Sequence, residues 1–175
     1  MHRKYLTRSS KQLGVTLVEL LIGIAILGIL AAIAVPSYTT FIANSQIRST
    51  TESIRNGLQI ARAEAVKRNA TVTFTLNANR SWVVGCLTVT ANCPATIQSK
   101  AANEGGSGTV TVNPNSGSVT FTNLGSATSY DVNVDNTSVS AANSKELRIR
   151  VGAGGNVRVC DPNISVTTDT RFCAT

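Results

Sequence analysis

Two short segments near the C-terminus place arginines at alternate positions, a pattern that could bind phosphate groups. On paired strands, segments 147–151 and 156–160 would carry Arg148, Arg150 and Arg158 on one face, opposite the apolar residues. Clustered arginines are typical of surfaces that contact a nucleic-acid backbone. No aromatic residue lies among them to stack on bases, so binding to double-stranded DNA would be independent of sequence and sensitive to salt.

The same cluster has a simpler interpretation as an ordinary charged strand face. Like charges on adjacent strands repel each other, so such a face needs acidic neighbours. Asp161 and Asp169 are candidates for this neutralisation, whereas two more basic residues would add to the positive charge. Both interpretations stay open, and the candidate DNA-binding set is Lys145, Arg148, Arg150, Arg158 and Arg171.

Four cysteines could either form two disulfides or bind a metal ion. They are Cys86, Cys93, Cys160 and Cys173. Neither pair has the spacing of two to four residues that is usual for thiolate ligands of zinc. An even number of cysteines fits two bridges, which persist in exported proteins. Three pairings are possible, and we favour the sequence-local one, 86–93 with 160–173.

Nothing in the sequence indicates an enzyme. The one histidine is His2, and no nucleophile elbow, phosphate-binding loop or paired-carboxylate motif is found. The glycine-rich stretch 152–157 lies between two predicted strands, and Val157 stands where a dinucleotide-binding loop requires its last glycine. This stretch is interpreted as a turn. We therefore expect no catalytic residues, no cofactor and no metal.

A long apolar segment distinguishes the N-terminal part of the chain. Residues 15–35 are apolar, Gly or Thr except for Glu19, and a helical run of this length spans the hydrocarbon core of a bilayer. Four of the 16 basic residues precede this segment, with no acidic residue among them. The positive-inside rule then places residue 36 onward across the membrane. A conventional secretory signal has a shorter apolar region, and a carboxylate inside such a region is costly.

The residues around Glu19 resemble a known processing signal. The stretch 11–21, which reads KQLGVTLVELL, is similar to the class III signal of type IV pilins and pseudopilins. This resemblance implies that a prepilin peptidase removes the leader 1–14 by cleavage after Gly14. It further implies N-methylation of Val15, with the apolar helix retained. The family usually has Phe at this first mature position, where this chain has Val15.

Glu19 is the candidate residue for subunit assembly. A carboxylate inside a membrane-spanning segment needs a partner or a proton. We expect Glu19 to pair with the free amino group of Val15 in a neighbouring subunit, which would set the axial register of the subunits. The alternative is a carboxylate that only reaches toward the membrane interface.

The helix that positions Glu19 and the basic residues after it can be predicted from the spacing of apolar residues. Apolar residues recur at helical spacing beyond Pro36, as a stripe formed by Ile47, Ile54, Leu58, Ala61 and Ala65. We therefore expect one long helix from residue 15 to about 68, bent near Pro36. Residues 15–36 would form its transmembrane and filament-core segment, and residues 37–70 its amphipathic continuation. Basic side chains on its last turns are expected on a solvated face: Arg62, Lys67 and Arg68.

The remainder, residues 71–175, is predicted to form a β-rich globular head with the disulfides. The predicted strands are 71–76, 81–90, 109–113, 118–122, 130–134, 147–151 and 156–160. Residues 113–117 are expected to form a hairpin turn, and residues 91–108 and 135–144 to form loops. The fold class is therefore α+β: a pilin-like fold whose long N-terminal helix packs on an antiparallel sheet.

Two segments of the head resemble one branch of the pilin superfamily. Segments 60–68 (IARAEAVKR) and 81–85 (SWVVG) are similar to the GspH/FimT group. The resemblance implies a minor type IV pilin of the FimT/FimU kind, a structural subunit in pilus assembly or in a tip complex. Its partners would be other major and minor pilins, the prepilin peptidase and, before assembly, the bacterial inner membrane. The protein would cross that membrane once, with a periplasmic head, and then join the extracellular pilus. The alternative is a GspH-like pseudopilin in the periplasmic pseudopilus of a type II secretion system.

The resemblance also bears on DNA. FimT-type pilins of competent bacteria are linked to DNA uptake in natural transformation through a GRxR motif in this C-terminal hairpin. The matching stretch 155–158 reads GNVR, so Asn156 replaces the first arginine and only Arg158 carries over. Arg148 and Arg150 would have to compensate from the adjacent strand. Binding of extracellular DNA is therefore kept as an addition to the structural role.

Overall fold

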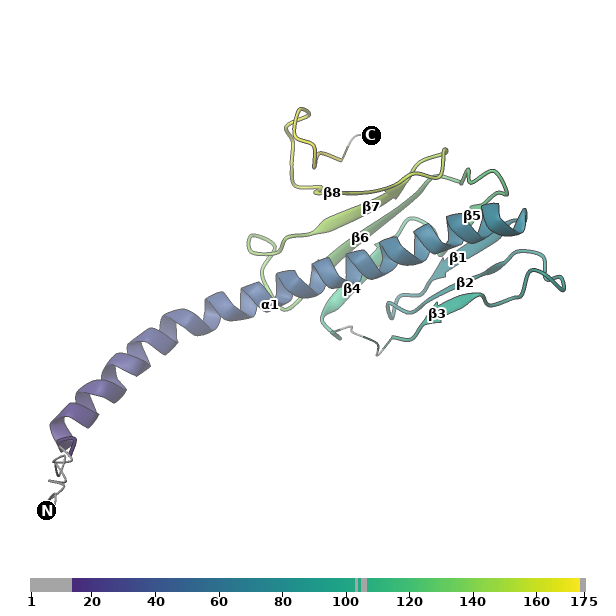
Figure 1. Ribbon diagram of the computed structural model, residues 1–175. Helices are drawn as coiled ribbons and strands as arrows, with labels where there is room; N and C mark the ends of the chain where they lie inside the picture. Colours follow the sequence, from purple (N-terminus) through teal and green to yellow (C-terminus); the bar gives the residue numbers. More distant parts are fainter. Residues whose placement is uncertain (1–13, 103, 105–106, 174–175) are drawn as a thin grey trace, which may run out of the picture. The chain divides into compact units, whose positions relative to one another are not determined.

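The computed structural model describes residues 14–173 except 103 and 105–106. The basic residues of the predicted leader therefore lie outside the described residues. The described chain divides into two compact units, one up to Tyr38 and one from Thr39 onward, which we call the N-terminal unit and the head. A single helix, α1 (Leu17–Arg68), runs through both units (Figure 1).

In the N-terminal unit, Thr16 caps the start of α1. Its Oγ1 accepts a hydrogen bond from the backbone N–H of Glu19 at 3.2 Å, and its carbonyl oxygen accepts one from the N–H of Leu20. Every large apolar side chain from Val15 to Val35 is at least 51% exposed. α1 is long and apolar enough to cross a membrane. Pro36 lies inside the helix without ending it.

The head contains eight strands in two antiparallel four-stranded sheets (Figure 1). One sheet has the order β3-β2-β1-β5 and the other has the order β4-β6-β7-β8. The strands are β1 (Val72–Leu76), β2 (Trp82–Cys86), β3 (Gln98–Lys100), β4 (Val110–Pro114), β5 (Ser118–Phe121), β6 (Tyr130–Asn136), β7 (Leu147–Val151) and β8 (Val157–Cys160). The predicted α+β fold class is thus confirmed.

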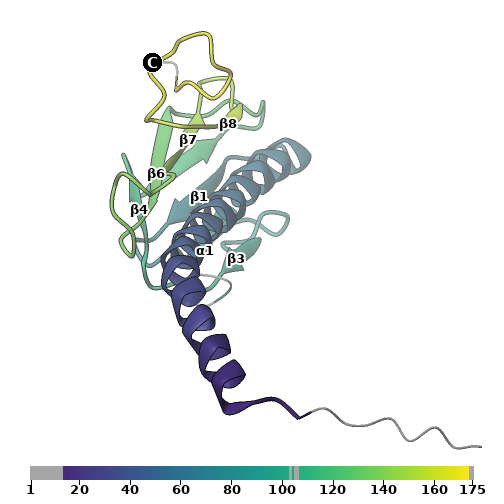
Figure 2. The same ribbon diagram turned by 90° about the vertical axis from the view of Figure 1, so that its left-hand side faces the viewer.

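The part of α1 inside the head packs on both sheets through its apolar stripe. The five predicted stripe residues are all buried, and they share one core with residues of the two sheets such as Phe74, Phe121, Tyr130 and Ile149. In Figure 2, β4 and β6 lie to the left of this part of α1 and β3 lies to its right. Gly57 allows the closest approach, since a Cβ at this position would lie 2.6 Å from the Phe74 ring.

The predicted hairpin turn at residues 113–117 is wrong. β4 pairs with β6 and β5 pairs with β1, so this segment crosses from one sheet to the other. Each end is held by a different sheet: Asn115 donates its backbone N–H to the Asp131 carbonyl, and the Gly117 carbonyl accepts from the Leu76 N–H. The composition of this segment is typical of a turn, but the strand partners depend on contacts distant in sequence.

The predicted loop 91–108 contains a strand that the sequence did not indicate. β3 pairs with β2 over three residues and is mostly exposed, so it carries no alternation of apolar and polar residues. The other strands agree with the predicted segments to within a few residues.

Candidate functional site

The predicted assembly residue lies in the first turn of α1. Glu19 occupies the third helical position after the capping residue Thr16, which is the spacing of a capping box. A negative charge is favourable there because the helix dipole is positive at its N-terminus. Among the described residues, no hydrogen bond or ion pair reaches the carboxylate of Glu19, and Val15 beside it is 71% exposed. The sequence analysis missed the role of Thr16, although the spacing Thr-x-x-Glu is its signal.

The C-terminal hairpin has the predicted strand pairing and face pattern. In β7 and β8, Arg150 lies opposite Arg158, and the apolar pairs Ile149–Val159 and Val151–Val157 face the core side. Arg148, Arg150 and Arg158 therefore share the opposite face of the sheet. Arg158 is exposed, and no hydrogen bond to its side chain is found within the described part of the chain.

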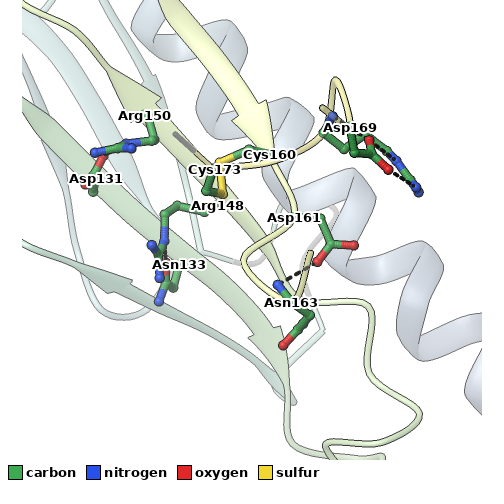
Figure 3. Close-up of a disulfide and its surroundings, with 10 residues drawn as sticks. Asp131, Asn133, Arg148, Arg150, Cys160, Asp161, Asn163, Asp169 and Cys173 are labelled. Carbon is green, nitrogen blue, oxygen red and sulfur yellow. Dashed lines mark hydrogen bonds and ion pairs between the residues drawn. A yellow bond between two sulfur atoms is a disulfide. The ribbon is translucent and has the colours of Figure 1, made fainter. Parts of the chain in front are cut away.

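The hydrogen-bonding partners of Arg148 and Arg150 come from β6, and they were not predicted from the sequence. Arg150 donates Nε to Asp131 Oδ1 at 3.0 Å, and Arg148 donates Nε to Asn133 Oδ1 at 2.6 Å (Figure 3). Among the described residues, neither Asp161 nor Asp169 forms an ion pair with these three arginines, so that part of the predicted neutralisation is wrong. Asp169 instead pairs with Arg171 at 2.9 Å, and this hydrogen-bonded guanidinium holds the pKa of Asp169 below its usual range.

The five candidate DNA-binding residues do not form one patch. Lys145 and Arg171 line a depression beside α1, together with Leu147 and Val159, on the face that carries the apolar residues of β7 and β8. Arg148, Arg150 and Arg158 alternate to the other face. The position of Lys145 could have been predicted from the sequence. Lys145 lies two residues before Leu147, and side chains two residues apart in an extended segment lie on the same face.

Two of the three basic residues near the end of α1 are tied to the head, in contrast to the predicted solvated face. Arg62 donates Nε to the Gly125 carbonyl and a second N–H to the Gly154 carbonyl, each at 3.2 Å. Arg68 binds Glu64 at 2.6 Å and also reaches the carbonyl of Asn92. Only Lys67 keeps a largely exposed side chain, at 71%.

The glycine-rich stretch 152–155 forms the β7–β8 turn, as expected, and it is docked onto a second turn. Gly155 has a φ of 71°, and a Cβ on it would lie 1.8 Å from the carbonyl oxygen of Gly125. Ala127 also donates its N–H to the Ala153 carbonyl at 3.0 Å. Close backbone approach therefore requires glycine at position 155.

The cysteines form the two sequence-local bridges, Cys86–Cys93 and Cys160–Cys173. The second bridge follows β8 directly and holds the C-terminal tail against it (Figure 3). Asp161 donates its backbone N–H to the carbonyl of Arg171 at 2.8 Å, and Asp161 and Phe172 form a parallel bridge. Within the described residues, no group of three or more His, Cys, Asp or Glu side chains could hold a metal ion.

Comparison with known proteins gives matches over both units. Residues 50–155 match the family model described as type II transport protein GspH, and residues 9–35 match the prokaryotic N-terminal methylation motif. The chain is 48% identical over 61 residues to the type IV major fimbrial protein FimA of Dichelobacter nodosus, which is 35% of this chain and 37% of that protein. The match thus spans about a third of the length of these curated relatives.

Solved structures from both pilus and secretion systems share the fold. The type IV minor pilin FimU of Pseudomonas aeruginosa superposes with a TM-score of 0.55 at 16% identity, over 68% of this chain and 91% of FimU. The minor pseudopilin EpsH of the Vibrio cholerae type 2 secretion system superposes with a TM-score of 0.53 at 12% identity, over 68% and 99%. Since the GspH model covers more than half of the sequence, the chain belongs to the GspH family of type IV pilin-like proteins.

Proposed function

We propose that this protein is a minor type IV pilin, a structural subunit that enters a filament through its N-terminal helix. The observation that carries this proposal is a capped apolar helix with one unpartnered carboxylate in its first turn, joined to a head of the GspH family. In this proposal a prepilin peptidase cleaves after Gly14 and Val15 is methylated. Lipid would cover the apolar helix before assembly, and helices of other pilins would cover it afterwards.

Assembly would depend on the charge of Glu19. Its carboxylate would pair with the amino terminus of a neighbouring subunit in a medium of low dielectric constant, where an unpaired charge is strongly disfavoured. We expect Glu19→Val to insert in the inner membrane at normal levels and to be lost from sheared filaments by at least about tenfold. The measurement is immunoblotting of membrane and filament fractions.

Glu19→Gln separates charge from capping. Glutamine retains a side chain that suits a capping box but cannot form the ion pair. If Glu19→Gln fails to enter filaments whereas Thr16→Val enters them, the charge is responsible. Normal incorporation of Glu19→Val would contradict the proposal.

The alternative function is that of a GspH-like pseudopilin in a type II secretion system. FimU and EpsH resemble the chain to nearly the same degree, so the fold favours neither system. The neighbouring genes distinguish the two, since one proposal expects pilus genes and the other secretion genes.

We further propose that the arginine face of the β7–β8 hairpin contacts double-stranded DNA. The supporting observation is that Arg158 is exposed and lies directly opposite Arg150. Because Asp131 neutralises Arg150, the contact would rest mainly on Arg158 and Arg148. Lys145 and Arg171 would take no part, since they lie on the other face of the hairpin.

This contact predicts binding that is sensitive to salt. For the detergent-solubilised full chain and a fluorescent duplex, we expect Arg158→Ala to lower the slope of log affinity against log salt by about 1. Lys67→Ala removes an exposed positive charge elsewhere and should change the slope less. Absence of binding at low salt, or equal effects of the two variants, would exclude the hairpin as a DNA site.

A further inference from the structure

β8 is the end strand of its sheet, and its outer edge is open at two residues (Figures 1 and 2). The Gly152 N–H donates to the Asn156 carbonyl, so residues 152 and 156 form a hydrogen-bonded pair of the antiparallel ladder. Such pairs alternate with non-bonded pairs, so the N–H and C=O groups of Val157 and Val159 point away from β7. Among the described residues, no hydrogen bond reaches these outward groups.

The same edge already accepts a strand from its own chain. Asp161, the next outward-pointing residue, donates its N–H to the Arg171 carbonyl and forms a parallel bridge with Phe172. The Cys160–Cys173 disulfide follows at once and holds the tail at this end. The tail therefore covers one outward position of the edge and leaves Val157 and Val159 open.

The depressions beside the open edge, between β8 and α1, are together called the groove. It consists of two depressions, of about 690 and 480 Å³, which are within the size range that accommodates bound groups. Val157, Val159 and Leu147 supply its apolar wall and are all half-buried. An added strand would place every second side chain in this groove, because side chains alternate between the faces of a sheet.

The groove carries an excess of positive charge. Its basic lining residues are Arg48, Arg62, Lys67, Lys145 and Arg171, and its acidic ones are Glu52 and Asp161. Lys67 and Arg171 are ion-paired with Glu64 and Asp169 outside the groove. No ion pair or hydrogen bond is found for the side chains of Arg48 and Lys145 in the described part of the molecule. The charge therefore favours an acidic partner and opposes a basic one.

The other three sheet edges are less suited to accept a strand. β3 has only three residues. β4 ends in Pro114, and Arg80 donates to the Val110 carbonyl at 2.8 Å. At the end of β5, Phe121 is bridged to Ala127 of the following turn. Only β8 combines open backbone groups with an adjacent apolar groove.

We propose that β8 binds an extended, acidic segment of a neighbouring filament subunit as a fifth strand of this sheet. Outward N–H and C=O groups of Val157 and Val159 form the ladder, and apolar side chains of the segment fill the groove beside α1. Its acidic side chains alternate to the opposite face of the sheet, beside the exposed Arg158. That the partner is a filament subunit rests on the proposed function. That the edge of β8 can accept a strand rests on the hydrogen-bond pattern alone.

The probes are short synthetic peptides that alternate Val with Glu, and matched peptides that alternate Val with Lys. Two further versions of the acidic peptide are N-methylated on alternate residues, one on the odd and one on the even set of amides. Strand addition uses only one of these sets, so we expect one methylated version to bind at least about tenfold more weakly than the other. Fluorescence anisotropy with the detergent-solubilised full chain measures this difference.

Val159→Pro tests the edge on the protein side. Its N–H points outward, so proline removes a donor for the partner without removing a β7–β8 hydrogen bond. We expect at least about tenfold weaker binding of the acidic peptide to Val159→Pro. Leu87→Ala, at an exposed residue that follows β2 in the other sheet, leaves the edge intact and should bind the peptide within about twofold of the unmodified chain.

Three further results decide the proposal. Unchanged near-ultraviolet circular dichroism and intact disulfides in Val159→Pro show that the hairpin is preserved. Arg158→Glu provides a second variant, which should weaken binding of the acidic peptide without altering the backbone. Equal binding of the two methylated peptides, equal binding of the lysine peptide, or no binding at all would overturn the proposal. None of these readouts depends on filament incorporation, so failure of the minor-pilin proposal would be recognised separately, by the Glu19 variants.

Discussion

Glu64 holds two basic side chains at the C-terminal end of α1. Its carboxylate binds Arg68 at 2.6 Å and Lys67 at 3.2 Å, and its side chain is only 16% exposed. Arg68 in turn reaches the Asn92 carbonyl in the loop closed by the Cys86–Cys93 bridge. One carboxylate thus fixes the arginine that joins the helix to this loop.

The pH dependence of head stability follows from this contact. The hydrogen bond from Arg68 is the main reason that the pKa of Glu64 lies below its ordinary value. A carboxyl group with a lowered pKa in the folded state stabilises the protein above its unfolded pKa, and this contribution is lost as the pH falls below about 4.3. We expect Glu64→Gln to lose about 0.5–1 kcal/mol of unfolding free energy at neutral pH and less in acid.

Urea unfolding of the full chain in detergent, followed through the fluorescence of the one tryptophan, Trp82, measures this difference. Glu52→Gln is the matched control, since Glu52 also pairs with an arginine on α1 but is 58% exposed. A loss for Glu64→Gln that is the same at pH 3 and pH 7 would show that the contact with Arg68 is not its cause.

At the scale of elements, the approach of α1 to the sheet depends on one small residue. Gly57 is buried, and a Cβ on it would lie 2.6 Å from Phe74 and 3.1 Å from Trp82. Trp82 is fixed by a hydrogen bond from its Nε1 to Ser53 Oγ on the preceding turn of α1. The two rings have little freedom to move, because both are almost fully buried in the core.

We expect Gly57→Val to destabilise the head by about 1–3 kcal/mol, since inserting methyl groups into a close-packed core forces neighbouring side chains to shift. Gly57→Ala should cost less, because alanine gains about 1 kcal/mol of helix propensity over glycine. Ala63→Val, at an exposed position of the same helix, is the control and should stay within about 0.5 kcal/mol. Urea unfolding at neutral pH provides the measurement, and an unchanged stability of Gly57→Val would contradict this packing argument.

At the scale of the whole molecule, the two units satisfy their apolar residues differently. The head buries its apolar residues in one core that includes both sheets and the second half of α1. The N-terminal unit leaves its large apolar side chains exposed in the single chain. Such a segment requires lipid or other apolar helices around it. The molecule is therefore built to have two environments.

The sequence by itself determined the helix, its buried stripe, the sheet-rich head and the faces of β7 and β8, because these depend on local periodicity. The single carboxylate at Glu19 was equally evident against an apolar background. Only the tertiary structure decided that residues 113–117 connect two sheets, that Asp131 neutralises Arg150, and that Arg171 lies apart from Arg158. The physical reason is that alternation fixes the side of a strand on which a residue lies. The neighbouring strand, and the charges that it supplies, are chosen by hydrogen bonds and packing between segments far apart in the chain.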